Sequence, residues 1–148
     1  WTEKYIRMLP DMTKNSRAHL VPLNSLALTT LKDLKRNAKQ SPFLFPKATN
    51  RNEHVCFDAI SKAASKFRQQ FPAFPKFVPR DIRRSVKTGL TSNGVTKLIA
   101  DRVHNHALTD VSSKHYDMYE YFKEKKQVLN KWKKLLEKAG AKKSPKSN

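Results

Sequence analysis

The sequence predicts a mainly α-helical protein that carries one small antiparallel β-hairpin. Several segments repeat apolar residues at helical spacing, and two short runs of β-formers near the start enclose a polar turn. Of the 148 residues 38% are hydrophobic, so the chain can bury a core even though its formal net charge is +19. We therefore expect one globular domain over 1–139 and a basic, disordered tail over 140–148.

The hairpin is expected from residues 3–8 and 18–23, with the segment PDMTKNSR as a polar, basic tip between them. Pro22 has no amide hydrogen to donate to a neighbouring strand, so it marks the second strand as an edge strand or as its end. The chain begins at Trp1, in what reads as the middle of a strand. We therefore expect it to be a piece of a longer protein.

Helices are expected, in order, over residues 24–38, 53–70, 79–93, 96–104, 109–116 and 121–139. Asn24 or Ser25 is suited to cap the first helix. Pro79 and Gly94 are suited to begin and end the third. The second has an apolar pattern that includes Cys56, so this thiol is expected to be buried.

The composition argues against several classes of site. One cysteine excludes an internal disulfide and a cysteine-based metal site, and three glycines without a GxGxxG or GKS/GKT pattern argue against a glycine-rich phosphate loop. We expect neither a metal nor a cofactor. There is no run long enough to span a membrane and no signal peptide, which is typical of a cytoplasmic protein. The excess of lysine and arginine favours a polyanionic partner, of which nucleic acid is the commonest.

The third predicted helix has a basic side, which we call the cationic strip: Arg80, Arg83, Arg84 and Lys87. Beside it, an apolar stripe of Ile82, Val86 and Leu90 is expected to face the core. Asp81 is the only acidic residue nearby in the sequence, so the strip is poorly neutralised from within. The planar guanidinium group suits bidentate contact with phosphate, and the strip therefore predicts an anion-binding surface.

Cleavage of a phosphodiester needs more than an anion-binding surface. It requires cations on the non-bridging oxygens, an in-line nucleophile and a proton for the leaving 5′ oxygen. Arg83 and His106 are candidates for the first task, Tyr116 for the second and Lys14, at the hairpin tip, for the third. Taken singly, each has an ordinary structural explanation, such as a core tyrosine or an exposed turn lysine.

The order of these motifs resembles the tyrosine recombinases, and in particular the phage-type integrases. The resemblance rests on the hairpin with TK, then on PRDIRRS, and then on SNGVTKLIADRVHNHALTDVSSKHYDMYEYFKEKKQVLNKW. It covers nearly the whole chain, to about Trp132, and corresponds to the C-terminal two-thirds of the catalytic domain. The resemblance implies the tyrosine recombinase catalytic-domain fold, truncated at its N-terminus.

The resemblance also implies a role for each matching residue. Arg83 matches the arginine that holds the scissile phosphate, and Lys14 matches the hairpin lysine that protonates the leaving oxygen. His106 matches the histidine that donates to a non-bridging oxygen, and Tyr116 matches the nucleophile that forms a 3′-phosphotyrosyl link. Arg84, Lys87 and Arg17 are expected to contact the DNA backbone.

Three departures from the family pattern stand out. Arg80 stands where the family has a histidine, and arginine cannot accept a proton, so an electrostatic role is expected there. The tyrosine follows the histidine by ten residues instead of the family's nine, with His115 at the ninth place and Tyr119 as the fallback nucleophile. The family's first catalytic arginine lies upstream of the hairpin and has no counterpart here, so the fragment alone is expected to be inactive.

The function implied is site-specific recombination, in which phage or genomic-island DNA is integrated or excised by strand cleavage and religation. The partner is double-stranded DNA carrying attachment sites, in the cytoplasm of a bacterial host at the nucleoid. The C-terminal helix and tail are expected to mediate self-association on DNA. The phosphotyrosyl link conserves the energy of the broken bond, so the reaction needs neither ATP nor a metal.

Two alternatives remain open. The first is a non-catalytic, basic helical DNA-binding domain, because residues 95–115 have some likeness to a helix-turn-helix, although His104 stands where the turn usually has glycine. The second is a type IB topoisomerase, which shares the phosphotyrosyl chemistry. Relaxation of supercoils without site preference would favour the topoisomerase.

Overall fold

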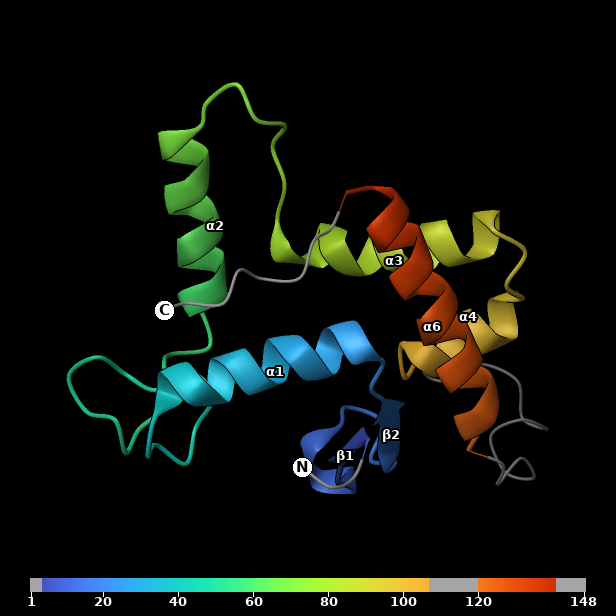
Figure 1. The fold of residues 1–148 in the computed structure, drawn as a ribbon, viewed down its shortest axis with the longest axis horizontal. Helices are drawn as coiled ribbons and strands as arrows, with labels where there is room; N and C mark the ends of the chain where they lie inside the picture. The colour runs from blue at the N-terminus through green and yellow to red at the C-terminus, as the bar shows by residue number, and fades with distance from the viewer. Residues whose placement is uncertain (1–3, 107–119, 141–148) are drawn as a thin grey trace. The chain divides into compact units, whose positions relative to one another are not determined.

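The computed structural model describes residues 4–106 and 120–140 (Figure 1). The strands and helices are β1 (Tyr5–Met8), β2 (His19–Pro22), α1 (Ser25–Ala38), α2 (Ala59–Gln70), α3 (Pro79–Ser92), α4 (Lys97–Val103) and α6 (Phe122–Lys138), with a 3₁₀ turn at Pro10–Met12. The predicted class, mainly helical with one antiparallel hairpin, is confirmed. The bounds of α1, α3, α4 and α6 agree with those expected to within two residues.

The chain divides into two compact units, with the boundaries falling inside α1 and α3. The first unit comprises Trp1–Leu28 and Val86–Asn148, and the second comprises Thr29–Ser85. The first unit therefore holds the hairpin, the C-terminal half of α3, α4 and α6. The second holds most of α1, all of α2 and the first turns of α3.

The hairpin is a two-stranded antiparallel sheet in which Tyr5 pairs with Pro22 and Met8 pairs with His19. The ladder continues past Pro22, because the amide of Leu23 donates to the carbonyl of Lys4 at 2.8 Å. Pro22 is the last residue of its strand, as predicted. Because Met8 and His19 form the last pair of the ladder, the tip of the hairpin lies between these two residues.

Helix α6 packs on the hairpin and on α4 in the first unit (Figure 1). Lys125 on α6 is only 3% exposed, and its Nζ donates to the Leu20 carbonyl of β2 at 2.8 Å. Burial lowers the pKa of Lys125 although the charge of Glu120 acts in the opposite direction. At the start of α6, the guanidinium of Arg102 lies 4.5 Å from the centre of the Tyr121 ring.

Close approach between α3 and α6 depends on a glycine. A β-carbon added to Gly89 would lie 2.6 Å from Cζ3 of Trp132, so the indole lies directly against the α3 backbone. One residue further along α3, Leu90 is completely buried. The apolar side of α6 thus packs within its own unit.

Asn24 joins the start of α1 to α6. Its side-chain oxygen accepts from the amide of Ala27 at 2.9 Å, which caps the first turn of α1 as predicted. Its amide nitrogen donates to the Leu129 carbonyl of α6 at 2.9 Å. One side chain therefore satisfies a helix end and a carbonyl 105 residues away.

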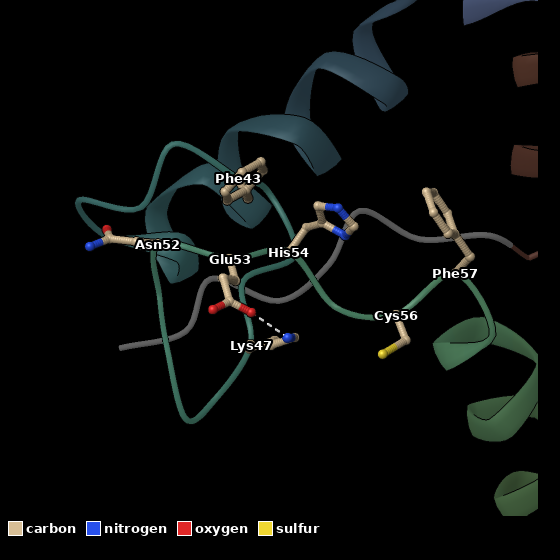
Figure 2. Close-up of a pocket in the computed structure, with 7 residues that line it drawn as sticks. All are labelled: Phe43, Lys47, Asn52, Glu53, His54, Cys56 and Phe57. Carbon is tan, nitrogen blue, oxygen red and sulfur yellow. Dashed lines mark hydrogen bonds and ion pairs between the residues drawn. The ribbon is translucent and has the colours of Figure 1, made fainter.

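The second unit differs from its prediction at α2. The helix begins at Ala59 and not at residue 53, because the chain before it pairs backbone with backbone. The amide of Val55 donates to the carbonyl of Phe45 at 2.9 Å, and Pro46 bridges to His54. These bonds draw residues 53–55 out of the helix, so Cys56 stands exposed on the loop that leads into α2 (Figure 2). The prediction of a buried thiol is wrong.

Phenylalanines in the last turn of α2 and in the segment after it form a cluster of their own. The ring of Phe67 lies 4.8 Å from that of Phe71 and 5.2 Å from that of Phe74, centre to centre. Both Phe71 and Phe74 remain about half exposed. These rings therefore pack on one another more than they close the edge of a core.

None of the helices in the described parts of the chain is both long and apolar enough to cross a membrane.

Candidate functional site

His106 is positioned by the way α4 ends. Helix α4 closes in a Schellman motif, in which His104 is the C-cap and Asn105 is the left-handed residue with φ of 51°. The His106 amide donates to the Asp101 carbonyl at 3.0 Å, and the Asn105 amide donates to the Arg102 carbonyl at 3.3 Å. This motif folds His106 back over the last turn of α4.

The His106 side chain meets Asp101 as a result. Nδ1 of His106 donates to Oδ1 of Asp101 at 2.8 Å, and Nζ of Lys87 approaches the same oxygen at 2.5 Å. In many Schellman motifs an apolar contact joins the residue that follows the left-handed residue to the helical residue five positions before it. Here these two residues are His106 and Asp101, and their contact is polar. Since Nδ1 is engaged, Nε2 is the ring nitrogen that can face a ligand.

Asp101 holds its charge in a half-buried position. Partial burial opposes its ionisation, but hydrogen bonds from Lys87 and His106 and their charges outweigh this, so the pKa of Asp101 lies below its ordinary value. The carboxylate therefore stays ionised and fixes the ring orientation of His106. The His104 ring stacks on that of His106 with centres 5.5 Å apart and planes 27° apart, and Nδ1 of His104 donates to the Ala100 carbonyl.

The hairpin tip that carries Lys14 is a closed, ordered turn. The amide of Ser16 donates to the Thr13 carbonyl at 3.1 Å, which makes Lys14 and Asn15 the central residues of the turn. Thr13 Oγ1 donates to the Arg17 carbonyl at 2.7 Å and accepts from the Arg17 amide at 3.0 Å. Lys14 itself is exposed.

Two asparagines join this tip to the end of α4. Asn15 Nδ2 donates to Asn105 Oδ1 at 3.1 Å, and Asn105 Nδ2 donates to Asn15 Oδ1 at 3.3 Å. Asn15 Nδ2 also lies 3.4 Å from the Asn105 carbonyl. We call this pair the amide clasp. It brings the neighbour of Lys14 against the neighbour of His106, across 90 residues of sequence.

The cationic strip lies on α3, and its members differ in their surroundings. Arg84 pairs with Asp81 at 3.1 Å, and Lys87 pairs with Asp101. Arg80 and Arg83, in the second unit, are exposed on the first turns of the helix. The apolar stripe beside the strip is only partly buried, because Ile82 is 60% exposed. The expectation that Ile82 faces the core is therefore wrong.

The predicted nucleophile Tyr116, its fallback Tyr119 and His115 lie outside the described residues. Of the other predicted site residues, the structure brings Lys14 and His106 into one unit through the amide clasp. Arg17 is half-buried at the base of the same turn.

A separate hollow of about 360 Å³ lies in the second unit, on the loop before α2. Figure 2 shows its lining, which includes the ion pair of Lys47 and Glu53 and the ring of Phe57. The Phe57 residue is 97% exposed. None of the predicted site residues lines it. Within residues 4–106 and 120–140, there is no group of three histidine, cysteine, aspartate or glutamate side chains placed to hold a metal ion.

Sequence reasoning missed three residues of this site: Asp101, Asn15 and Asn105. Asp101 had one readable signal, since an acid five residues before a histidine becomes its neighbour when a helix ends between them. Asp101 also means that Asp81 is not the only acid that neutralises the cationic strip. The two asparagines had no local signal, because their contact is long-range.

Comparisons with protein families, with curated proteins and with solved structures found no match to this chain.

Proposed function

We propose that this chain is the C-terminal part of the catalytic domain of a tyrosine recombinase, which cleaves and rejoins double-stranded DNA through a 3′-phosphotyrosyl intermediate. The observation that carries the proposal is the amide clasp. It joins the hairpin of Lys14 to the turn of His106, two residues that the sequence pattern assigns to one phosphate. A chance likeness of motifs gives no reason for these two segments to meet.

In this proposal the residues act as follows. The Tyr116 hydroxyl loses its proton to solvent water as its oxygen attacks the phosphorus, the 3′-phosphotyrosyl bond forms, and the bond to the 5′ oxygen breaks. Lys14 gives its proton to that leaving oxygen. His106 donates from Nε2 to a non-bridging oxygen, and Asp101 holds the ring in the required orientation through Nδ1. In the reverse step a 5′ hydroxyl returns its proton to Lys14 and attacks the phosphorus, which rejoins a strand and releases Tyr116 to be reprotonated by water.

The arginines supply charge. Arg83 binds a non-bridging oxygen of the scissile phosphate, and Arg80 serves as an electrostatic clamp since it cannot act as a base. Arg84, Lys87 and Arg17 belong to the surface that meets the DNA backbone, where Arg84 and Lys87 are already paired with acids of the chain. The helix α6 packs on its own domain, so self-association on DNA is assigned to the tail that follows it.

The test is covalent capture of DNA by the full-length recombinase that carries this chain. The substrate is a pool of duplexes with random flanks around one 5′-bridging phosphorothiolate, because the thiolate leaves readily and rejoins poorly, so that the covalent complex accumulates. Wild-type protein should retain DNA under denaturing conditions, and sequencing of that DNA yields the preferred site. Tyr116→Phe should retain none while binding DNA with nearly unchanged affinity.

Tyr119→Phe is the matched control, and it should retain DNA as the wild type does.

The net charge of +19 favours a second candidate function, a non-catalytic basic DNA-binding domain. That candidate predicts tight binding without a denaturation-resistant complex in any variant. Cleavage at every sequence of the pool alike would instead favour a topoisomerase.

A further inference from the structure

We infer that the amide clasp between Asn15 and Asn105 is a positioning device, which sets the place of Lys14 relative to the phosphate that His106 contacts. The inference rests on the proposed function and adds to it two residues that the recombinase resemblance does not assign. Both act through a neighbour: Asn15 follows Lys14, and Asn105 precedes His106.

The clasp is a reciprocal contact, in which each amide both donates and accepts. The two side-chain bonds measure 3.1 Å and 3.3 Å, and both residues are half-buried. A reciprocal amide pair fixes distance and orientation together, whereas a single bond leaves rotation about it. The clasp therefore restrains the tip in more than one direction.

The turn transmits this restraint to Lys14. Lys14 and Asn15 are adjacent in a turn closed by the bond from the Ser16 amide to the Thr13 carbonyl. The two bonds between Thr13 and Arg17 close the base of the same turn. A turn held at its base and at Asn15 leaves the Lys14 backbone little freedom, so the position of its side chain follows that of the clasp.

The identity of residue 105 supports a purpose for its side chain. Asn105 has φ of 51°, where glycine is the residue that fits without strain. Asparagine tolerates this conformation but gains nothing from it by comparison with glycine. The amide group is what asparagine adds at this position, and that group both accepts from and donates to Asn15 of the hairpin tip.

Replacement of Asn105 can therefore separate the clasp from the turn. Asn105→Gly retains the left-handed end of α4, and with it the contact of His106 with Asp101, but removes the amide. Asn15→Ala removes the other half from the hairpin side. Because the two residues act as one contact, the double variant should be no worse than either single variant.

The experiment compares two substrates of the sequence recovered from the duplex pool, one with an ordinary phosphate and one with the 5′-bridging phosphorothiolate. A thiolate leaving group needs no proton, so a defect in proton delivery disappears on the sulfur substrate. Cleavage is measured in single turnover as covalent complex formed, with a nicked suicide strand in the ordinary substrate. The proteins are full-length wild type, Asn105→Gly, Asn15→Ala, the double variant, Lys14→Ala and His106→Ala.

We expect the three asparagine variants to cleave the ordinary substrate about tenfold more slowly, which corresponds to the loss of two modest hydrogen bonds. On the sulfur substrate they should recover the wild-type rate. Lys14→Ala should show a larger loss with the same recovery. His106→Ala should remain slow on both substrates, because its role lies at the non-bridging oxygen.

Different outcomes overturn different claims. An equal loss on both substrates means that the asparagines act on something other than Lys14 and overturns the inference. Wild-type rates for the asparagine variants on both substrates overturn it as well and leave the proposed function standing. No covalent complex from wild type on either substrate overturns the proposed function, and with it the role of the clasp.

Discussion

Nδ1 of His106 lies 2.8 Å from Oδ1 of Asp101, and the ammonium group of Lys87 approaches the same carboxylate oxygen. One acid thus organises a histidine that follows α4 and a lysine on α3. The contact exists because α4 ends in a Schellman motif, which returns the residue after the turn to the last helical turn. Asp101 is for this reason both a structural and a functional residue in our account.

The charge of Asp101 should make the stability of the protein fall in acid. Its pKa is lowered in the folded state by its hydrogen bonds, against the effect of burial, so its contribution is present above the unfolded-state pKa of about 3.9. The contribution is lost as the pH falls through the lower folded-state value. Chemical denaturation should be carried out from about pH 2 to about pH 7. The difference in the free energy of unfolding between wild type and Asp101→Asn should shrink below about pH 4. An exposed acid of the same unit, Asp11, provides the control variant Asp11→Asn. A pH-independent difference for Asp101→Asn would contradict the prediction.

Gly89→Ala should destabilise the protein although alanine is the better helix former. The change gains up to about 1 kcal/mol of helix propensity. It also places a β-carbon 2.6 Å from Cζ3 of Trp132, and overpacking of this kind costs about 1–3 kcal/mol. We expect a net loss of about 1–2 kcal/mol in the free energy of unfolding. Thr88→Ala, at an exposed position one residue away, should show no such loss. Stabilisation by Gly89→Ala would mean that the indole does not pack on α3.

Asn24 offers a prediction that separates its two hydrogen bonds. Asn24→Ser keeps an oxygen that can cap α1 but is too short to reach the Leu129 carbonyl, so it should cost about 1 kcal/mol. Asn24→Ala loses both bonds and should cost about 2 kcal/mol. Urea denaturation of the three proteins measures both differences. Equal stabilities of the two variants would show that the bond to α6 contributes nothing.

Binding to duplex DNA should depend steeply on salt. If about five to eight phosphates are neutralised, the affinity should fall by roughly three orders of magnitude between 50 and 200 mM salt. Fluorescence anisotropy with a labelled duplex at several salt concentrations gives the slope. Arg80→Ala, at an exposed and basic position of α3, should lower the slope by about one unit, whereas an exposed uncharged position such as Thr91→Ala should leave it unchanged. A flat response to salt would contradict DNA binding through the phosphate backbone.

The bounds of α1, α3 and α4 were predictable because each of these helices carries its own local signals. Pro79 begins α3, Gly94 follows its end with φ of 80°, and Asn24 and Thr96 cap α1 and α4 through their side chains. Such signals act within a few residues, so a single sequence reveals them.

The start of α2 was not predictable on this basis. Val55 and Cys56 continue the helical spacing of Ala59 and Ile60, and the periodicity therefore extends too far towards the N-terminus. The competing backbone pairing of residues 45–55 depends on how a loop closes on itself, which no local pattern announces. Ile82 was misassigned for a related reason, since spacing shows which face is apolar but not whether anything covers it.

The candidate site was predictable only in part, because local motifs can be read from the sequence whereas contacts formed by folding cannot. Lys14, Arg83, His106 and Tyr116 were chosen from the order and spacing of motifs. Asp101 and the amide clasp required the folded chain, because one depends on the geometry of a helix end and the other joins residues 90 positions apart.

The measurement that tests the central claim most directly is the identification of the residue that becomes linked to DNA. Full-length protein is captured on the phosphorothiolate duplexes, digested with nuclease and protease, and examined by mass spectrometry for a peptide that carries a 3′-nucleotide. Our account predicts a nucleotide attached through phosphate to Tyr116. A link to any other residue, or tight DNA binding without a linked peptide, would contradict it.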